Sequence, residues 1–287
     1  MEFGVTMFPT DFSMGAAELA IAVEERGLDA LFIPDHSHIP AERKSPFRIG
    51  DELPADYYRN VDMFIALAAA AAVTKRIRLG TGICLVIERD PITLAKEVAS
   101  LDYISNGRVD FGIGGGWNRE EMENHGTDWT RRFKVLRERI EAMKAIWTTE
   151  EASYNGEFVN FERIWSWPKP VQSPHPPIFV GGDAPNTIDR VLKYGDGWIP
   201  MLADKDDPNW DDKYARMAEL AVRAQESGRE PIPITTFGTP NDPRIIERLA
   251  ESGVNRCIFG IKASPTDKVL RRLDRVLGIR DQFMGNR

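Results

Sequence analysis

Apolar and polar positions follow two different patterns along this chain. Short, continuous apolar runs are typical of buried strands, and they separate longer stretches in which apolar residues recur at helical spacing. The runs predict strands at residues 4–8, 30–34, from 77 onward, 109–113, 178–180, 197–200, 232–237 and 256–260. The amphipathic stretches predict helices at residues 16–26, 64–73, 91–104, 184–194, 214–225, 245–250 and from 265 onward.

Residues with known capping preferences mark several ends of these elements. Asp90 precedes Pro91, which places a favourable N-cap before a proline at the first helical position. Gly27 and the pair Asn106-Gly107 follow helical stretches, where a residue in the left-handed conformation commonly ends a helix. The cap signals therefore agree with the alternation of strands and helices.

Each of the eight expected strands is followed by an expected helix. Strands joined by helical crossovers form a parallel sheet. Eight such units predict an α/β fold, a (β/α)8 TIM barrel that forms a single domain over residues 1–287. An open, doubly wound sheet is the alternative. The first strand is not followed by a dinucleotide-binding glycine fingerprint, and the glycine run at 112–116 lies at the fourth strand.

The alternation is interrupted between the fourth and fifth strands, which predicts an insertion into the barrel. Apolar residues at helical spacing predict a helix over 133–147, and residues 154–158 resemble a hairpin turn. Residues 168–177 are rich in proline, which excludes a helix there.

Composition narrows the class of protein. The 287 residues include 42% hydrophobic and 28% charged residues, and the net charge is −7. Because basic residues are interleaved with acids, nucleic acid is not an expected partner. The two cysteines cannot form a disulfide framework. We find no signal peptide and no apolar run long enough to cross a bilayer, so we expect a cytoplasmic protein with no membrane partner.

Polar residues follow the second expected strand, at the end where barrel enzymes carry their active sites. Asp35, His36, Ser37 and His38 stand there, and they include two of the four histidines. His36 is the candidate for proton transfer, because histidine titrates near neutral pH. Asp35 is a candidate to orient it, and His38 is expected to be a bystander. A metal site is the less favoured interpretation, because no further cluster of ligands is evident.

Two glycine-rich segments follow other strands. Gly114, Gly115 and Gly116 remove side chains at the barrel mouth, where a flat ring system fits, and Trp117 would lie at its edge or in the core. Gly181-Gly182, followed by Asp183 and Ala184, lies between a strand and a helix. Backbone N–H groups at such a turn bind phosphate well, although the same sequence also suits an ordinary tight turn.

Together these segments resemble the luciferase-like flavin and deazaflavin oxidoreductases, and in particular their coenzyme F420-dependent branch. The residues that carry the resemblance span nearly the whole chain. They are Phe8-Pro9, Asp35-His36, Leu79 through Ile83, Arg89-Asp90-Pro91, Lys96, Ser105 through Arg108, Gly112 through Trp117, Glu121, the proline-rich segment 168–177, Gly181-Gly182 and Gly195 through Trp198.

The resemblance implies a set of roles for these residues. The fold would be an α/β barrel with an insertion between strands four and five, and the cofactor ring would lie in its mouth. Asp35 and His36 would flank the ring, with His36 as acid or base. A cis peptide bond would join Gly82 to Ile83, after Thr81. The Gly181-Gly182 turn would bind phosphate.

The resemblance also suggests the reaction. We expect hydride transfer between F420 and a small organic substrate, and an FMN-dependent monooxygenase is the alternative. Two less favoured hypotheses are a metal-assisted hydrolase and a flavin-binding homologue without catalytic activity. Trp117 replaces a glutamate of the sugar-phosphate dehydrogenases, which argues against that substrate. The loop at 39–59 and the insertion at 117–177 are expected to shape the pocket. The insertion holds Trp129, Trp147, Trp165 and Trp167, which either favour an apolar or flat substrate or belong to the core. By family analogy we expect a homodimer.

Overall fold

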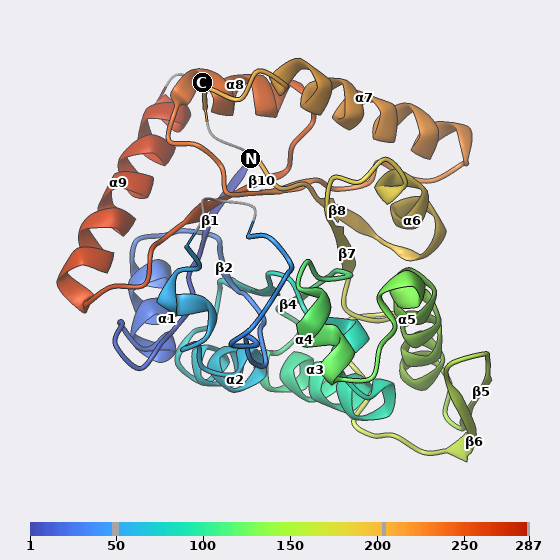
Figure 1. The fold of residues 1–287 in the computed structure, drawn as a ribbon. Coiled ribbons are helices and arrows are strands. Elements are labelled where there is room, and N and C mark those ends of the chain that lie inside the picture. Colours follow the sequence, from blue (N-terminus) through green and yellow to red (C-terminus); the bar gives the residue numbers. More distant parts are fainter. Residues whose placement is uncertain (48–51, 203–204, 286–287) are drawn as a thin grey trace.

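The computed structural model describes residues 1–47, 52–202 and 205–285. Within them, parallel strands form one sheet in the order β8-β7-β4-β3-β2-β1-β10-β9 (Figure 1). The terminal strands β8 and β9 meet through parallel bridges at Trp198–Ile234 and Met201–Phe237, which close the sheet into a barrel. The strands are β1 (Glu2–Thr6), β2 (Ala30–Ile33), β3 (Arg78–Thr81), β4 (Val109–Ile113), β7 (Ile178–Gly181), β8 (Gly197–Ile199), β9 (Thr235–Phe237) and β10 (Arg256–Gly260).

The helices surround the barrel, and an insertion departs from it. Figure 1 shows the small antiparallel sheet of β5 (Ala152–Asn155) and β6 (Asn160–Ile164) beside α5, away from the strands of the barrel. The predicted barrel and its insertion are therefore confirmed. The helices are α1 (Ala16–Glu25), α2 (Met63–Val73), α3 (Pro91–Ser105), α4 (Arg119–Asn124), α5 (Arg132–Thr148), α6 (Thr187–Tyr194), α7 (Trp210–Glu226), α8 (Pro243–Glu251) and α9 (Thr266–Gly285), with 3-10 turns η1 (Ala55–Tyr57), η2 (Val86–Glu88) and η3 (Trp129–Arg131).

Some predicted boundaries differ from the structure. Strands β4 and β10 have the predicted bounds, but β1 lies two residues earlier than expected. Helix α6 begins at Thr187, three residues later than expected, because the turn after β7 continues through Asn186. Helix α4 was not predicted, since six residues with one apolar position carry too little periodicity to be recognised.

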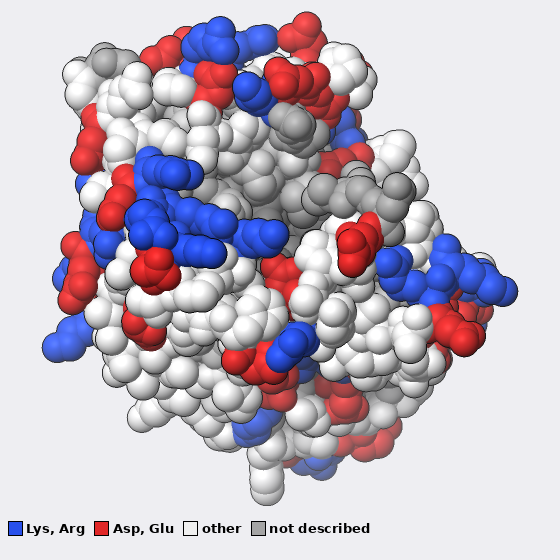
Figure 2. All heavy atoms as spheres, turned by 60° about the vertical axis from the view of Figure 1, so that its left-hand side comes forward, with Lys and Arg blue, Asp and Glu red and all other residues white. Residues whose placement is uncertain are grey.

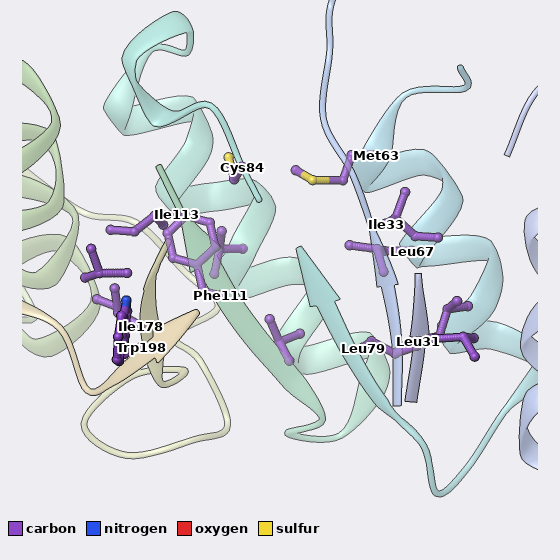
Figure 3. Packing of buried hydrophobic residues seen from close by; sticks show 14 of the residues in the cluster. Leu31, Ile33, Met63, Leu67, Leu79, Cys84, Phe111, Ile113, Ile178 and Trp198 are labelled. Atoms are coloured by element: carbon purple, nitrogen blue, oxygen red, sulfur yellow. The ribbon is translucent and has the colours of Figure 1, made fainter. Parts of the chain in front are cut away.

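The apolar core has two parts. One lies between the strands and the surrounding helices, where Figure 3 shows Leu31 and Ile33 of β2 facing Leu67 of α2. The other fills the barrel interior, and Ile83 packs on it from the segment after β3. A filled interior leaves no pore, so ligands meet the barrel only at its ends. The interior cluster consists of Ala30, Phe32, Phe179, Ile199, Phe237 and Ile258.

Buried charges close the end of the barrel at which the strands begin. Asp110 of β4 accepts a hydrogen bond from Arg256 Nη1 at 2.6 Å and pairs with Arg78, and Arg256 also contacts Glu2 at 2.6 Å. Because each buried charge is paired, this network is structural. In the part of the chain described, no helix is long and apolar enough to cross a membrane.

Candidate active site

A buried histidine–glutamate pair lies at the C-terminal end of β2. His36 Nδ1 is 2.8 Å from Glu121 Oε2, and the exposed fractions of the two residues are 8% and 0%. Glu121 Oε1 accepts a hydrogen bond from the Ser37 backbone N–H at 3.1 Å. With the carboxylate ionised, the histidine Nδ1 carries the hydrogen, and Nε2 is the atom that can exchange a proton with a substrate.

Asp35 has a different role from the one that its position next to His36 suggests. Its carboxylate accepts hydrogen bonds from the Leu85 backbone N–H at 3.0 Å and from Arg89 Nη2 at 2.8 Å. Burial lowers the pKa of Arg89, but the hydrogen bond and charge of the Asp35 carboxylate raise it. The net effect is a raised pKa. Asp35 therefore fixes the segment after β3, and the carboxylate that orients His36 is Glu121. The sequence interpretation missed this role, although Glu121 was among the residues of the resemblance.

A second buried carboxyl group lies near this pair. Glu88 has a side chain 4% exposed, and its Oε2 is 3.8 Å from His125 Nε2. Burial, together with the charge of Glu121, raises the pKa of Glu88 to about 9. Ser37 Oγ lies 2.7 Å from His125 Nε2 and 2.9 Å from Nδ1 of the half-buried His38. Among the described residues, no group of three or more potential ligands is placed to hold a metal ion.

The segment after β3 enters the barrel mouth at Gly82-Ile83. The peptide bond between these residues is cis, which confirms the prediction. A Cβ added to Gly114 would lie 1.8 Å from Ile83 Cδ1, and one added to Gly181 would lie 3.0 Å from Ile83 Cγ2. Thr81 Oγ1 donates a hydrogen bond of 2.6 Å to a carbonyl oxygen of β4. Glycines just after β4 and at the end of the neighbouring β7 thus provide the space that Ile83 occupies.

The rest of the glycine run positions an aromatic side chain. A Cβ added to Gly115 would lie 2.7 Å from the Phe133 ring, and Gly116 has a φ of +65°, which favours glycine. Trp117 follows, and its ring meets that of His36 edge-on, with 5.9 Å between centroids. Trp117 therefore belongs to the site and not to the core.

The turn after β7 is held by its own contacts. Gly182 has a φ of +116°, and its N–H donates to Ile199 O at 3.0 Å. Arg216 donates to the carbonyl oxygens of Asp183 and, at 2.9 Å, of Ala184. The Gly182 N–H is thus occupied. The turn lies between β7 and α6, as expected, and the binding of phosphate there stays a prediction.

Groups suited to an anion lie near the same turn. Thr187 Oγ1 and Arg132 Nε are buried and have no hydrogen-bond partner among the described residues. A Cβ added to Gly182 would lie 3.8 Å from Thr187 Oγ1. The guanidinium groups of Arg190 and Arg132 lie 3.5 Å and 4.4 Å from the Phe133 ring centroid. These unsatisfied donors fit the phosphate that both F420 and FMN carry.

Aromatic rings from four chain segments surround His36. The ring centroid of Tyr57 lies 4.8 Å from that of Phe8, 5.4 Å from that of His36 and 5.0 Å from that of Phe47. The Phe47 centroid lies 5.7 Å from that of Trp117. We call Phe8, His36, Phe47, Tyr57 and Trp117 the aromatic cluster. Two members come from the predicted pocket loop at 39–59, of which residues 48–51 lie outside the described residues.

Four other tryptophans of the insertion, Trp129, Trp147, Trp165 and Trp167, lie outside this cluster. Trp147 is buried, and its Nε1 donates to Ala95 O at 2.9 Å. Trp165 and Trp167 are 75% and 57% exposed. Trp129 lies under the guanidinium of Arg132 at 3.6 Å. Trp147 is therefore a core residue, one of the two alternatives for these side chains, and the contribution of the rest of the insertion to the pocket stays a prediction.

Charge is unevenly distributed over one face of the molecule. Figure 2 shows a concentrated group of basic side chains beside a hollow surrounded mainly by uncharged atoms. Elsewhere on this face, acidic and basic side chains are interspersed.

The fold and the site together define an α/β barrel with a histidine–glutamate pair and a glycine-lined mouth at the C-terminal ends of its strands. The family model described as luciferase-like monooxygenase matches residues 13–240. The chain belongs to this family, whose members are oxidoreductases or monooxygenases.

Relatives with and without an assigned activity are similar to this chain. An uncharacterized protein of Mycobacterium tuberculosis is 40% identical over 281 residues, covering 96% of this chain and 97% of that protein. The flavin-dependent trigonelline monooxygenase oxygenase component of Acinetobacter baylyi is 40% identical over 134 residues, 46% of this chain and 37% of that protein. The F420-dependent hydroxymycolic acid dehydrogenase of Mycobacterium tuberculosis is 31% identical over 178 residues, 61% of this chain and 46% of that protein.

Solved structures share the fold. The monooxygenase RslO1 of Streptomyces bottropensis has a TM-score of 0.77 at 21% identity and covers 97% of this chain and 98% of its own. The F420-dependent tetrahydromethanopterin reductase of Methanopyrus kandleri has a TM-score of 0.75 at 18% identity and covers 98% of this chain and 99% of its own. F420-dependent and oxygen-using proteins thus share this barrel.

Proposed function

We propose that this protein transfers a hydride between coenzyme F420 and a small organic substrate, and that His36 exchanges the accompanying proton. The buried contact of 2.8 Å between His36 Nδ1 and Glu121 Oε2 carries this proposal. It gives the imidazole one orientation and leaves Nε2 to act as acid or base. Oxidation of an alcohol removes a hydride from carbon and a proton from oxygen, so a positioned base is required.

The chain's own residues fit such a cofactor. The glycine-lined mouth above Ile83 suits a flat ring, and Arg132, Arg190 and Thr187 suit its phosphate. The remaining proposed cofactor contacts are the backbone of Thr81 and Gly82, the run from Gly114 to Trp117 and the turn from Gly181 to Ala184. Bound F420 would supply the carbon that accepts or donates the hydride. Asp35 and Arg89 would hold the segment on which the ring rests.

A second candidate is an FMN-dependent monooxygenase. The relative that supports it is the trigonelline monooxygenase component, 40% identical over 134 residues. The dehydrogenase that uses F420 is less identical but matches over 178 residues. We favour F420 because proton exchange by a charge-paired histidine suits hydride chemistry at an alcohol or carbonyl carbon.

A cofactor titration tests the proposal. Purified protein is titrated with F420 and, separately, with FMN, and binding is followed by fluorescence. We expect F420 to bind at least tenfold more tightly. His36→Asn should retain F420 binding but lose about a hundredfold or more in turnover, whereas the variant His38→Asn, at the half-buried histidine two residues away, should match the wild type. FMN binding without F420 binding, or full turnover by His36→Asn, would contradict the proposal.

A homodimer remains a proposal as well. Exposed apolar side chains occur on α2, on α3 and in the segment after β6, and they include Ile65, Tyr103 and Trp165. Apolar groups of this size are candidates for contact with a second copy. Light scattering during gel filtration should give twice the chain mass, and a monomer at micromolar concentration would refute this.

A further inference from the structure

We propose that Glu120 is a positioning residue that holds residues 43–47 across the rings beside His36, and that release of this segment is the step that opens access to His36. We call the contacts of residues 43–47 with Arg119 and Glu120 the latch. The latch itself is inferred from the described residues alone, and its place in cofactor binding rests on the proposed function.

Residues 43–47 belong to no helix or strand, and their hydrogen bonds to other segments all go to the start of α4. Glu120 accepts hydrogen bonds from the backbone N–H groups of Lys44 at 2.8 Å and Ser45 at 3.4 Å. Ser45 Oγ accepts one from the Arg119 N–H at 3.0 Å, an N–H of the first helical turn that has no partner within the helix. Within the described residues, no further hydrogen bond joins the segment to the rest of the chain. A segment held by so few contacts opens locally more readily than the elements around it.

The latched segment places side chains on both rings that flank His36. The ring centroid of Phe47 lies 5.0 Å from that of Tyr57 and 5.7 Å from that of Trp117. The Tyr57 and Trp117 centroids lie 5.4 Å and 5.9 Å from that of His36, which is only 8% exposed. At the other end of the segment, the Arg43 guanidinium lies 5.6 Å from the Trp117 centroid. Release of the segment would therefore uncover the rings that shield the imidazole.

The chemistry of the latch keeps it closed at rest and lets it open reversibly. The hydrogen bond with the Ser45 side chain, opposed by burial and supported by the Lys44 N–H, lowers the pKa of Glu120 to about 2. The acceptor is therefore ionised at neutral pH, and hydrogen bonds to a charged acceptor are stronger than neutral ones. Glu120 and Ser45 are half-buried, and Lys44 is exposed. Water can thus replace these hydrogen bonds when the segment opens, so that opening leaves no buried polar group unpaired.

Three measurements on the full chain test the latch, and two of them need no cofactor. Hydrogen–deuterium exchange reports opening at the Lys44 and Ser45 amides, and the rate of acylation by diethylpyrocarbonate, located by mass spectrometry, reports access to His36. Stopped-flow fluorescence then gives the association and dissociation rate constants of F420. Glu120→Ala removes the acceptor, and Ser45→Ala is a second variant should Glu120→Ala fail to fold. Glu123→Ala is the matched control, because Glu123 lies on the same helix in an exposed pair with the Arg119 side chain.

We expect Glu120→Ala to raise amide exchange in the segment and acylation of His36 by about threefold or more, and Glu123→Ala to leave both within about twofold. Acylation of His175, a buried histidine that lies against Trp147 and outside the latch, should not change. F420 should both associate and dissociate faster, with a smaller change in Kd, because a gate alters access and not the bound contacts.

Two results would overturn the inference. One is faster amide exchange in Glu120→Ala without faster acylation of His36, which is the pattern of a purely structural contact. The other is equal behaviour of Glu120→Ala and Glu123→Ala in exchange, in acylation or in the rate constants of F420. A wild type that shows the exchange and acylation pattern but does not bind F420 would refute the proposed function alone.

Discussion

Replacing Glu121 by glutamine would test the histidine–glutamate pair directly. The amide has nearly the same shape as the carboxylate, and its oxygen can still accept the hydrogen bond that Ser37 N–H gives at 3.1 Å. The substitution removes the charge that faces His36 Nδ1 at 2.8 Å. Because both side chains are buried, water cannot replace the lost interaction.

The magnitude follows from the geometry. A hydrogen bond to a charged group contributes about 1.5–3 kcal/mol, and each 1.4 kcal/mol corresponds to about tenfold in rate. If the carboxylate stabilises a protonated His36 in the transition state, Glu121→Gln should lower kcat about tenfold to hundredfold. The amide also allows the wrong histidine tautomer, which adds to the loss. The F420 Kd should change little, because within the described residues the Glu121 carboxylate forms hydrogen bonds only with His36 and the Ser37 backbone.

The assay is steady-state oxidation of a secondary alcohol, followed by the bleaching of F420 absorbance between pH 5 and 9. Glu123→Gln is the matched control, because Glu123 lies on the same helix α4 and faces solvent in an exposed pair with Arg119. A folded Glu121→Gln protein whose kcat stays within twofold of the wild type across this range would refute the proposed role of Glu121.

Three further changes test the framework around the site. Gly114→Ala should lower the free energy of unfolding by about 1–3 kcal/mol, because its Cβ would lie 1.8 Å from Ile83 Cδ1. The control Gly260→Ala has open space around the added Cβ and should leave that free energy unchanged, so equal urea midpoints for the two variants would contradict this. Because the pKa of Glu88 is raised in the folded state, the folded protein keeps a proton on this carboxyl group at pH values where the unfolded chain has released it. The contribution of Glu88 to the free energy of unfolding is therefore fully present below about pH 4.5 and is lost as the pH rises toward about 9. Glu88→Gln should flatten the decline of urea stability from pH 5 to 9, and an unchanged slope would refute the assignment. Arg89→Met should destabilise the fold by about 3 kcal/mol, because Asp35 would lose its buried counter-charge; calorimetry that shows no shift in Tm would argue against this pairing.

The fold could be predicted from the sequence because its signals are local. Buried strands such as β4 and β10 are short apolar runs, and α3 has Asp90 as N-cap before Pro91. These preferences act over a few residues. Element order then limits the topology, because parallel strands need crossover helices. Where the local signal is weak, as in α4, the prediction failed.

The site could be predicted only in part. The position of His36 after β2 identified it as the candidate acid or base, and the glycines after β4 marked the mouth. Its partner could not be derived from spacing, because Glu121 is 85 residues away and lies on an unpredicted helix. The adjacent carboxylate of Asp35 was the natural choice along the chain, but it pairs with Arg89.

The sequence by itself thus determined the barrel, its insertion and the strand ends that carry the candidate chemistry, because backbone preferences and burial patterns are written into neighbouring residues. Only the tertiary structure decided which carboxylate faces His36, and which aromatic rings surround it. Those choices depend on side-chain contacts between segments far apart in the chain, which arise when the barrel closes and brings its loops to one end.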